Sequence, residues 1–279
     1  FVGEIPKWDG AKKKRSSKSK AQQESPVVYD RRSKGIMTES LRILSTNIDF
    51  MRDASKTSQA ITMSSFSSSA GKSFVTINLA ACFADNKKKL VIVDLDLRKR
   101  SLSKTIDRNN HVGLIQYMLG KEENIDNIIS HSDASEYLDY IVCEKTPPNA
   151  TQLLLEDKMD KLVADLRERY DYIIFDTTPA QIVADAAIVN RCADLTMYIT
   201  RVGYLNKTSF PFIQELCDKG KFKNMAIVMT DVPLIKRRYY GGKGYGYGYG
   251  YGYGYGYGYG YGYGYGYGED KKDKDKKKS

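Results

Sequence analysis

Apolar residues gather in short runs between about residues 35 and 235. Mostly aliphatic runs predict buried strands at 60–64, 90–94, 138–143, 172–176, 195–200 and 225–230. Between them, apolar residues recur every three or four positions and predict helices at 38–51, 72–84, 159–169, 184–192 and 207–219. This alternation predicts an α/β fold, a mostly parallel sheet with helices on both faces. Such sheets bind ligands beyond the carboxyl ends of their strands.

Both ends of the chain depart from this pattern. Residues 1–34 are rich in Lys, Ser and Gln and predict a disordered basic linker, while residues 236–279 predict a disordered tail. Each end carries ten Lys or Arg against four Asp or Glu, a net charge of +6, which leaves −2 of the total +10 for residues 35–235. A nearly neutral body without an aromatic and basic patch argues against a specific nucleic-acid partner.

The triplet Gly71-Lys72-Ser73 lies directly between a predicted strand and a predicted helix. This is the setting of a P-loop, in which main-chain amides surround phosphate, the lysine reaches the β and γ oxygens, and the serine hydroxyl binds Mg²⁺. Phe66 stands where the first glycine of the usual pattern is expected, and the alternative for the triplet is an ordinary surface turn. The candidate nucleotide-binding residues are Ser68, Ser69, Ala70, Gly71, Lys72, Ser73 and Phe74.

Three aspartates follow predicted strands. Asp94 and Asp96 end the strand at 90–94, and Asp176 ends the strand at 172–176. Carboxylates in this position next to a P-loop can hold Mg²⁺, directly or through water, and one can accept a proton from an attacking hydroxyl. The alternative is that each aspartate only caps the turn or helix that follows it.

The tail repeats one chemical group. From Tyr245 to Tyr267, tyrosine alternates with glycine, and two further tyrosines precede the repeat. Without aliphatic residues the segment cannot offset the entropy of ordering, so it predicts a mobile array of phenol hydroxyls. The candidate phosphate acceptors are Tyr239, Tyr240, Tyr245, Tyr247, Tyr249, Tyr251, Tyr253, Tyr255, Tyr257, Tyr259, Tyr261, Tyr263, Tyr265 and Tyr267.

Together these motifs resemble the catalytic domain of bacterial tyrosine kinases of the polysaccharide co-polymerase family. The loop, Asp94 and Asp96 with Arg98 after them, the Asp176-Thr-Thr-Pro segment and the tyrosine tail carry the resemblance, and residues 3–6 and 147–149 add to it. It implies a P-loop kinase that uses ATP and Mg²⁺. Lys72 and Ser73 would bind phosphate and metal, Asp96 and Asp176 would assist the metal, and Asp94 would be the base.

The resemblance also implies partners. Subunits would form a ring in which each phosphorylates the tail of its neighbour, so as to regulate capsular or exopolysaccharide synthesis and export. An upstream transmembrane co-polymerase segment would place the domain on the cytoplasmic side of the inner membrane, and a tyrosine phosphatase would reset the tail. The family joins subunits through a Glu-x2-Arg-x2-Arg helix, which here has Glu39 and Arg42, but Ser45 replaces the second arginine.

Two other functions fit part of the sequence. An ATPase of the partitioning or division-site type, similar to ParA or MinD, shares the fold and the aspartates, but typically has a lysine early in the loop, and residues 66–70 contain none. A non-catalytic assembly scaffold would explain the tyrosines as adhesive aromatic groups. It would leave Lys72 and the aspartates without a role.

Overall fold

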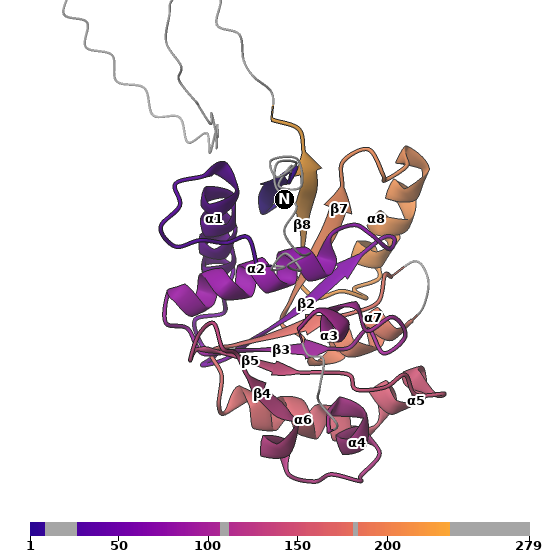
Figure 1. Cartoon of the computed structure of the whole chain (residues 1–279). Coiled ribbons are helices and arrows are strands. Elements are labelled where there is room, and N and C mark those ends of the chain that lie inside the picture. Colours follow the sequence, from indigo (N-terminus) through magenta and orange to yellow (C-terminus); the bar gives the residue numbers. More distant parts are fainter. Residues whose placement is uncertain (9–26, 107–111, 181–183, 235–279) are drawn as a thin grey trace, which may run out of the picture. The chain divides into compact units, whose positions relative to one another are not determined.

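A computed structural model describes residues 1–8, 27–106, 112–180 and 184–234. Its strands form one sheet in the order β1-β8-β7-β2-β6-β3-β5-β4 (Figure 1). Every neighbouring pair is parallel except β4 with β5. The strands are β1 (Gly3–Pro6), β2 (Gln59–Ser65), β3 (Leu90–Asp94), β4 (Ile129–His131), β5 (Leu138–Ile141), β6 (Tyr172–Asp176), β7 (Leu195–Arg201) and β8 (Met225–Val232).

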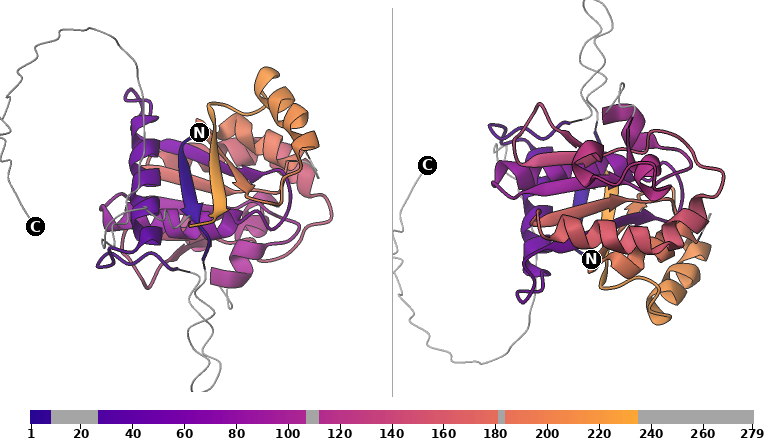
Figure 2. Two further views of the ribbon diagram at one scale, coloured as in Figure 1. Left: turned by 90° about the horizontal axis from the view of Figure 1, so that it is seen from above. Right: turned by 90° about the horizontal axis from the view of Figure 1, so that it is seen from below.

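Helices cover both faces of this sheet, as the sequence predicts. One face carries α1 and α2, and the other carries the layer that contains α6 (Figures 1 and 2). The α-helices are α1 (Ile36–Phe50), α2 (Lys72–Asp85), α3 (Ser101–Ile106), α4 (Leu114–Met118), α5 (Ala150–Leu155), α6 (Asp157–Arg167), α7 (Asp185–Val189) and α8 (Phe210–Asp218). Short 3-10 turns lie at η2 (Ile125–Ile128), η3 (Asn190–Cys192) and η4 (Lys207–Ser209).

The central strands are buried on both sides, because successive side chains of a strand point to opposite faces. On β6, Tyr172 and Ile174 pack with α1 and α2, whereas Ile173 and Phe175 pack with α4, α5 and α6. The Tyr172 ring stacks on Phe83 of α2, with ring centroids 4.3 Å apart. The continuous apolar runs of the sequence therefore mark strands that have no solvent-facing side.

The N-terminal residues correct the expected boundary of the folded domain. Residues 1–34 were expected to be linker, but Gly3–Pro6 forms β1, which pairs with β8 at the edge of the sheet (Figure 2). Val2 and Ile5 are buried in the core, and the Asn47 side chain of α1 donates to the Val2 carbonyl at 2.7 Å. The described parts of the first compact unit, Phe1–Ile235, accordingly include β1 as well as residues after 35, and the second unit, Lys236–Ser279, lies outside the described residues.

A second part of the expected linker is also attached to the domain. The backbone amides of Val28 and Tyr29 both donate to the Asn78 side chain of α2, at 2.7 and 2.9 Å. The Tyr29 hydroxyl donates to Asp85 at 2.9 Å, and burial is the main reason that its pKa is raised. Residues 27–34 therefore lie against α1 and α2 instead of leaving the domain.

Other differences from the predicted elements are small. The helix expected at 184–192 is the short α7 followed by a 3-10 turn, and the one expected at 207–219 begins with a 3-10 turn before α8. The strand expected at 138–143 ends at Ile141. The elements α3, α4, α5 and β4 were not predicted, because none of them is longer than six residues. In the described part of the chain, no helix is long and apolar enough to cross a membrane.

Candidate functional site

The loop between β2 and α2 has the backbone of a phosphate-binding loop. Gly71 caps α2 with φ = +93°, a left-handed conformation that glycine adopts without strain, and Ser69 is also left-handed with φ = +63°. Helix α2 begins at Lys72, so its first unpaired amides open toward the loop. A helix N-terminus with free amides is a natural site for an anion.

Side chains from two neighbouring strands hold the carbonyl groups of this loop. The Thr230 hydroxyl of β8 donates to the Ala70 carbonyl at 2.7 Å. Arg201, at the end of β7, donates to the Ser69 carbonyl at 3.1 Å and forms an ion pair with Asp231 at 2.6 Å. Because these bonds fix the carbonyls, they also fix the direction of the amides that alternate with them. Neither Arg201 nor Thr230 was predicted from the sequence.

Asp176 lies at the centre of the site and contacts both P-loop residues that carry functional groups. The Ser73 hydroxyl donates to Asp176 Oδ2 at 2.6 Å, and Lys72 Nζ lies 3.6 Å from Asp176 Oδ1. Asp176 is 1% exposed, and burial raises its pKa although the Lys72 charge opposes this change. Its Oδ1 atom is buried and has no hydrogen-bond partner. The structure thus brings together three of the residues that the sequence singled out.

Asp94 ends the neighbouring strand β3 and Asp96 follows it by two residues, and their surroundings differ. Asp94 is fully buried and accepts bonds from the Ser103 amide at 2.8 Å, the Ser103 hydroxyl at 2.5 Å and the Asp96 amide at 3.1 Å. Burial, with a smaller effect of the Asp176 charge, raises the pKa of Asp94 to about 7. Asp96 accepts the Lys99 amide at 3.0 Å through one oxygen.

The donor set fits a magnesium ion. Within the described residues, no group of three or more His, Cys, Asp or Glu side chains forms a metal site by itself. Mg²⁺, however, is usually held by one or two carboxylates together with substrate phosphates and water. Asp176 Oδ1, which has the Lys72 ammonium 3.6 Å away but no hydrogen-bond partner, is an oxygen ligand of the required kind beside the Ser73 hydroxyl.

The structure explains why phenylalanine can replace the first P-loop glycine. The Phe66 ring packs edge to face against Phe212 of α8, with centroids 5.8 Å apart. Phe66 also lacks the positive φ that would require glycine. A large side chain is therefore accommodated at this position by α8.

Two basic residues after β3 join the site without having been predicted to do so. Lys99 Nζ donates to the Ser68 hydroxyl at 2.7 Å, so it reaches across to the phosphate-binding loop. Arg98 donates to Asp185 at 3.0 Å, and Asp185 is buried. Arg98 belongs to the segment that carries the family resemblance, and the sequence signal for Lys99 is the cluster of positive charges after Asp96.

The residues expected at a subunit interface lie on α1 but have partners within the chain. Arg42 pairs with Glu39 and donates to the carbonyls of Arg31 and Ser33, and thus helps to hold residues 27–34. Ser45 is 3% exposed and accepts a hydrogen bond from the Cys82 thiol at 3.4 Å. The tyrosine acceptors at 239–267 lie outside the described residues.

The fold and this site define a P-loop nucleoside-triphosphate-binding protein. Residues 58–201 match the family model described as an AAA domain. The kinase domain of the Escherichia coli tyrosine kinase Etk has a similar structure, with a TM-score of 0.73 and 26% identity, covering 89% of this chain and 94% of that chain.

Two curated relatives narrow the class of P-loop protein to which this chain belongs. A tyrosine-protein kinase of Bacillus subtilis, YwqD, is 30% identical over 218 residues, which are 78% of this chain and 91% of the relative. The tyrosine-protein kinase Etk of Escherichia coli K12 is 31% identical over 165 residues, which are 59% of this chain but only 22% of that longer protein. The chain belongs to the bacterial tyrosine kinase family within the AAA-domain proteins.

Proposed function

We propose that this protein is a tyrosine kinase that transfers the γ-phosphate of ATP to the tyrosines of its own tail, in a neighbouring copy. The observation that carries the proposal is the contact of Asp176 with both Lys72 and Ser73 at the mouth of a P-loop. Membership of the family and a tail with twelve tyrosines in the repeat 245–267 support the choice of acceptor.

Each residue of the site has a task in this transfer. Amides of residues 68–74 and the Lys72 ammonium bind the β- and γ-phosphates, and Arg201 and Thr230 keep the loop in shape. Ser73 and Asp176 would hold Mg²⁺, which would neutralise charge that develops on the phosphate oxygens. The tyrosine oxygen attacks the γ-phosphorus, the bond to the bridging oxygen breaks, and ADP leaves.

The proton of the tyrosine hydroxyl must go to a carboxylate. The resemblance suggests Asp94, and a pKa of about 7 suits a proton acceptor at neutral pH. Both aspartates are buried, but Asp94 already accepts three hydrogen bonds, whereas Asp96 accepts the Lys99 amide through one oxygen. We therefore propose that Asp96 takes the proton and that Asp94 positions it.

Phosphorylation would also regulate assembly. Each phosphotyrosine adds about −1.5 to −2 charges, so modification of half the repeat outweighs the net charge of +6 on residues 236–279. We propose that the added charge drives tails out of neighbouring acidic sites and loosens a ring of subunits, and that a phosphatase restores it. A transmembrane co-polymerase partner, a place at the inner membrane and control of capsular or exopolysaccharide synthesis belong to the same proposal.

The test is to incubate the purified chain with Mg²⁺ and ATP and to count phosphates on the peptide 239–267 by mass spectrometry. Lys72→Met should abolish the added phosphates, because it removes the charge that contacts the γ-phosphate. Lys104→Met, which changes an exposed lysine on α3, is the matched control and should be phosphorylated like the parent.

A different result would favour the second candidate function. If the parent hydrolyses ATP and its tail stays unmodified, the protein is an ATPase of the partitioning or division-site type, which the parallel sheet and P-loop also fit. If it neither hydrolyses ATP nor gains phosphate, while thermal unfolding shows that it is folded, a scaffold is the better description.

A further inference from the structure

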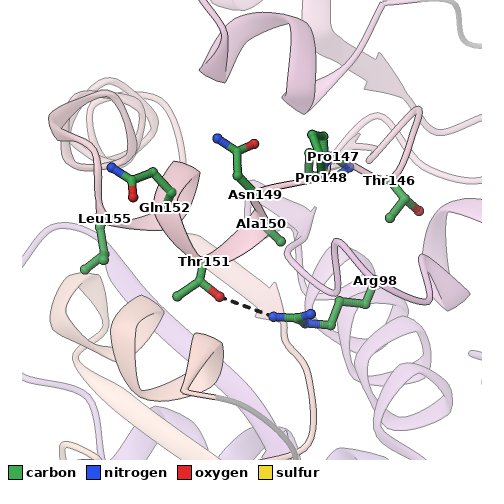
Figure 3. A pocket seen from close by; sticks show the side chains of 9 residues that line it. All are labelled: Arg98, Thr146, Pro147, Pro148, Asn149, Ala150, Thr151, Gln152 and Leu155. Atoms are coloured by element: carbon green, nitrogen blue, oxygen red, sulfur yellow. Dashed lines mark hydrogen bonds between the residues drawn. The ribbon is translucent and has the colours of Figure 1, made fainter.

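A cleft of about 500 Å³ opens between Arg98 and the segment 146–155 (Figure 3). One wall is Arg98, which follows Asp96 by two residues, and the rest comes from residues 146–152 and Leu155, in the loop after β5 and in α5. Its volume falls within the range of about 300–1,000 Å³ that is usual for ligand-binding clefts. None of the residues described above as phosphate-binding lines this cleft.

The cleft lies where an acceptor must approach. The phosphate-binding loop follows β2, and the sheet continues through β6 to β3 and β5, so Asp176 and Asp96 lie between the loop and the cleft. In phosphoryl transfer the attacking and leaving oxygens are roughly in line with phosphorus. A nucleotide held after β2 therefore leaves the side toward β3 and β5 for the acceptor.

An internal ion pair fixes the two walls of the cleft. Asp185 accepts from Arg98 at 3.0 Å and from the Thr151 hydroxyl at 2.7 Å, and its side chain is 2% exposed. Arg98 also donates to Thr151 at 3.2 Å, as Figure 3 shows. Because both carboxylate oxygens of Asp185 are used, the cleft is formed before a ligand binds, and the charge of Arg98 is balanced.

The lining fits an uncharged aromatic residue in a chain with little steric bulk. Pro147 and Pro148 offer apolar ring surfaces, and Asn149 and Gln152 offer amide groups that can bond to a peptide backbone. Among the described residues that line the cleft none is acidic, and the cation among them, Arg98, is already paired with Asp185. Tyrosine flanked by glycine meets these conditions, since glycine has no side chain to collide with the walls.

We propose that this cleft binds the acceptor, a tyrosine of the 245–267 repeat of a second copy with its flanking glycines. The proposal rests on the kinase function proposed above and names the binding site of its protein substrate. The described chain ends at Leu234, and Tyr267 lies 33 residues beyond it, which span at most about 110–120 Å when extended. Within that limit the tail can extend toward the cleft of an adjacent copy, and twelve tyrosines in the repeat allow many to enter in turn.

The experiment uses the full chain and the synthetic peptide Gly-Tyr-Gly-Tyr-Gly-Tyr-Gly. Gln152→Trp places an indole in the cleft from an exposed position, and Lys161→Trp places the same group on α6 outside it. Peptide binding is measured with Mg²⁺ and a non-hydrolysable ATP analogue, and phosphate transfer to the peptide is measured with ATP. We expect Gln152→Trp to weaken binding and to raise the KM for peptide at least tenfold, with the KM for ATP unchanged. Lys161→Trp should behave like the parent.

The outcomes separate the cleft from the kinase function. If Gln152→Trp binds and phosphorylates the peptide like the parent, or if the parent does not bind the peptide, the cleft is not the acceptor site. If a peptide that already carries phosphotyrosine binds more tightly than the unmodified one, the cleft is an anion site and the proposal is wrong. A third result is that the parent binds the peptide and Gln152→Trp does not, while neither transfers phosphate. The cleft is then a binding site for the peptide, and the proposed kinase function is wrong.

Discussion

Replacing Asp94 by asparagine should change the pH dependence of stability in a direction that the structure fixes. In the protein without nucleotide, burial and the nearby Asp176 charge raise the pKa of Asp94 from 3.8 to about 7. A carboxyl group whose pKa is raised on folding binds its proton more tightly in the folded state. Its contribution to stability is complete below about pH 3.8 and is lost as the pH rises to about 7.

The size of this change in stability follows from the difference between the pKa of Asp94 in the unfolded and in the folded state. One pKa unit corresponds to about 1.4 kcal/mol, so the parent should lose up to about 4 kcal/mol through Asp94 between pH 4 and pH 8. Asparagine does not titrate, so the variant loses none of this stability as the pH rises. Its amide does disturb the bonds from Ser103 and from the Asp96 amide, a cost of about 1–3 kcal/mol that is nearly independent of pH.

The assay is urea unfolding of parent and variant from pH 4 to pH 8, without Mg²⁺ or nucleotide. The unfolding free energy of Asp94→Asn minus that of the parent should increase as the pH rises, by up to about 4 kcal/mol. Asp133→Asn, the same substitution at an exposed position, is the matched control. Addition of Mg²⁺ and ATP should shrink the change for Asp94→Asn, because a cation opposes protonation of nearby carboxylates. A flat difference for Asp94→Asn without Mg²⁺ would refute the assignment of a raised pKa.

Three further predictions concern residues outside the catalytic centre. Arg201→Ala should raise the KM for ATP about 5- to 30-fold, because the Ser69 carbonyl loses its hydrogen bond, and Arg201→Lys should have less effect. Steady-state kinetics that show only a lower kcat would contradict this role. Ser45→Arg, which supplies the second arginine of the Glu-x2-Arg-x2-Arg pattern, should lower the unfolding temperature, because the guanidinium would be forced against buried Cys82. Calorimetry that shows no decrease would mean that an arginine side chain at this position can reach solvent. Deletion of residues 1–8 should reduce the free energy of unfolding by about 2–5 kcal/mol, because Val2 and Ile5 leave the core. Urea unfolding equal to that of the parent would show that β1 does not contribute to stability.

The sequence predicted the central part of the fold because those strands have one environment on both sides. Strands β3 and β6 are apolar runs that end in an aspartate, β2 has polar residues among its apolar ones, and the boundaries of all three agree with the prediction within one residue at each end. Strand β1 could not be found in this way, since it has four residues, among them a glutamate and a proline. Its burial results from the partner strand β8 and from α1, which a local pattern does not report.

The same reasoning applies to the site. Aspartates at the ends of parallel strands must meet at one edge of the sheet, so the contact of Asp176 with Ser73 could be predicted. Arg201 and Thr230 contact carbonyls that lie 132 and 160 positions away, and no spacing in the sequence indicates such a pair. At Asp94 the motif suggests the base, and only the structure shows that the Ser103 amide and hydroxyl both donate to this carboxylate.

The pairing of β1 with β8 also has a mechanical consequence. The two strands are parallel, Pro6 is opposite Val232, and the Lys7 amide donates to the Val232 carbonyl at 3.0 Å. The chain therefore continues from both strands at the same end. A force that separates these two continuations loads the hydrogen bonds one after another, as in unzipping, rather than all together in shear. The first bond to break would be that of Lys7, beside the Thr230 that supports the phosphate-binding loop, so tension there would reach the nucleotide site before the rest of the sheet.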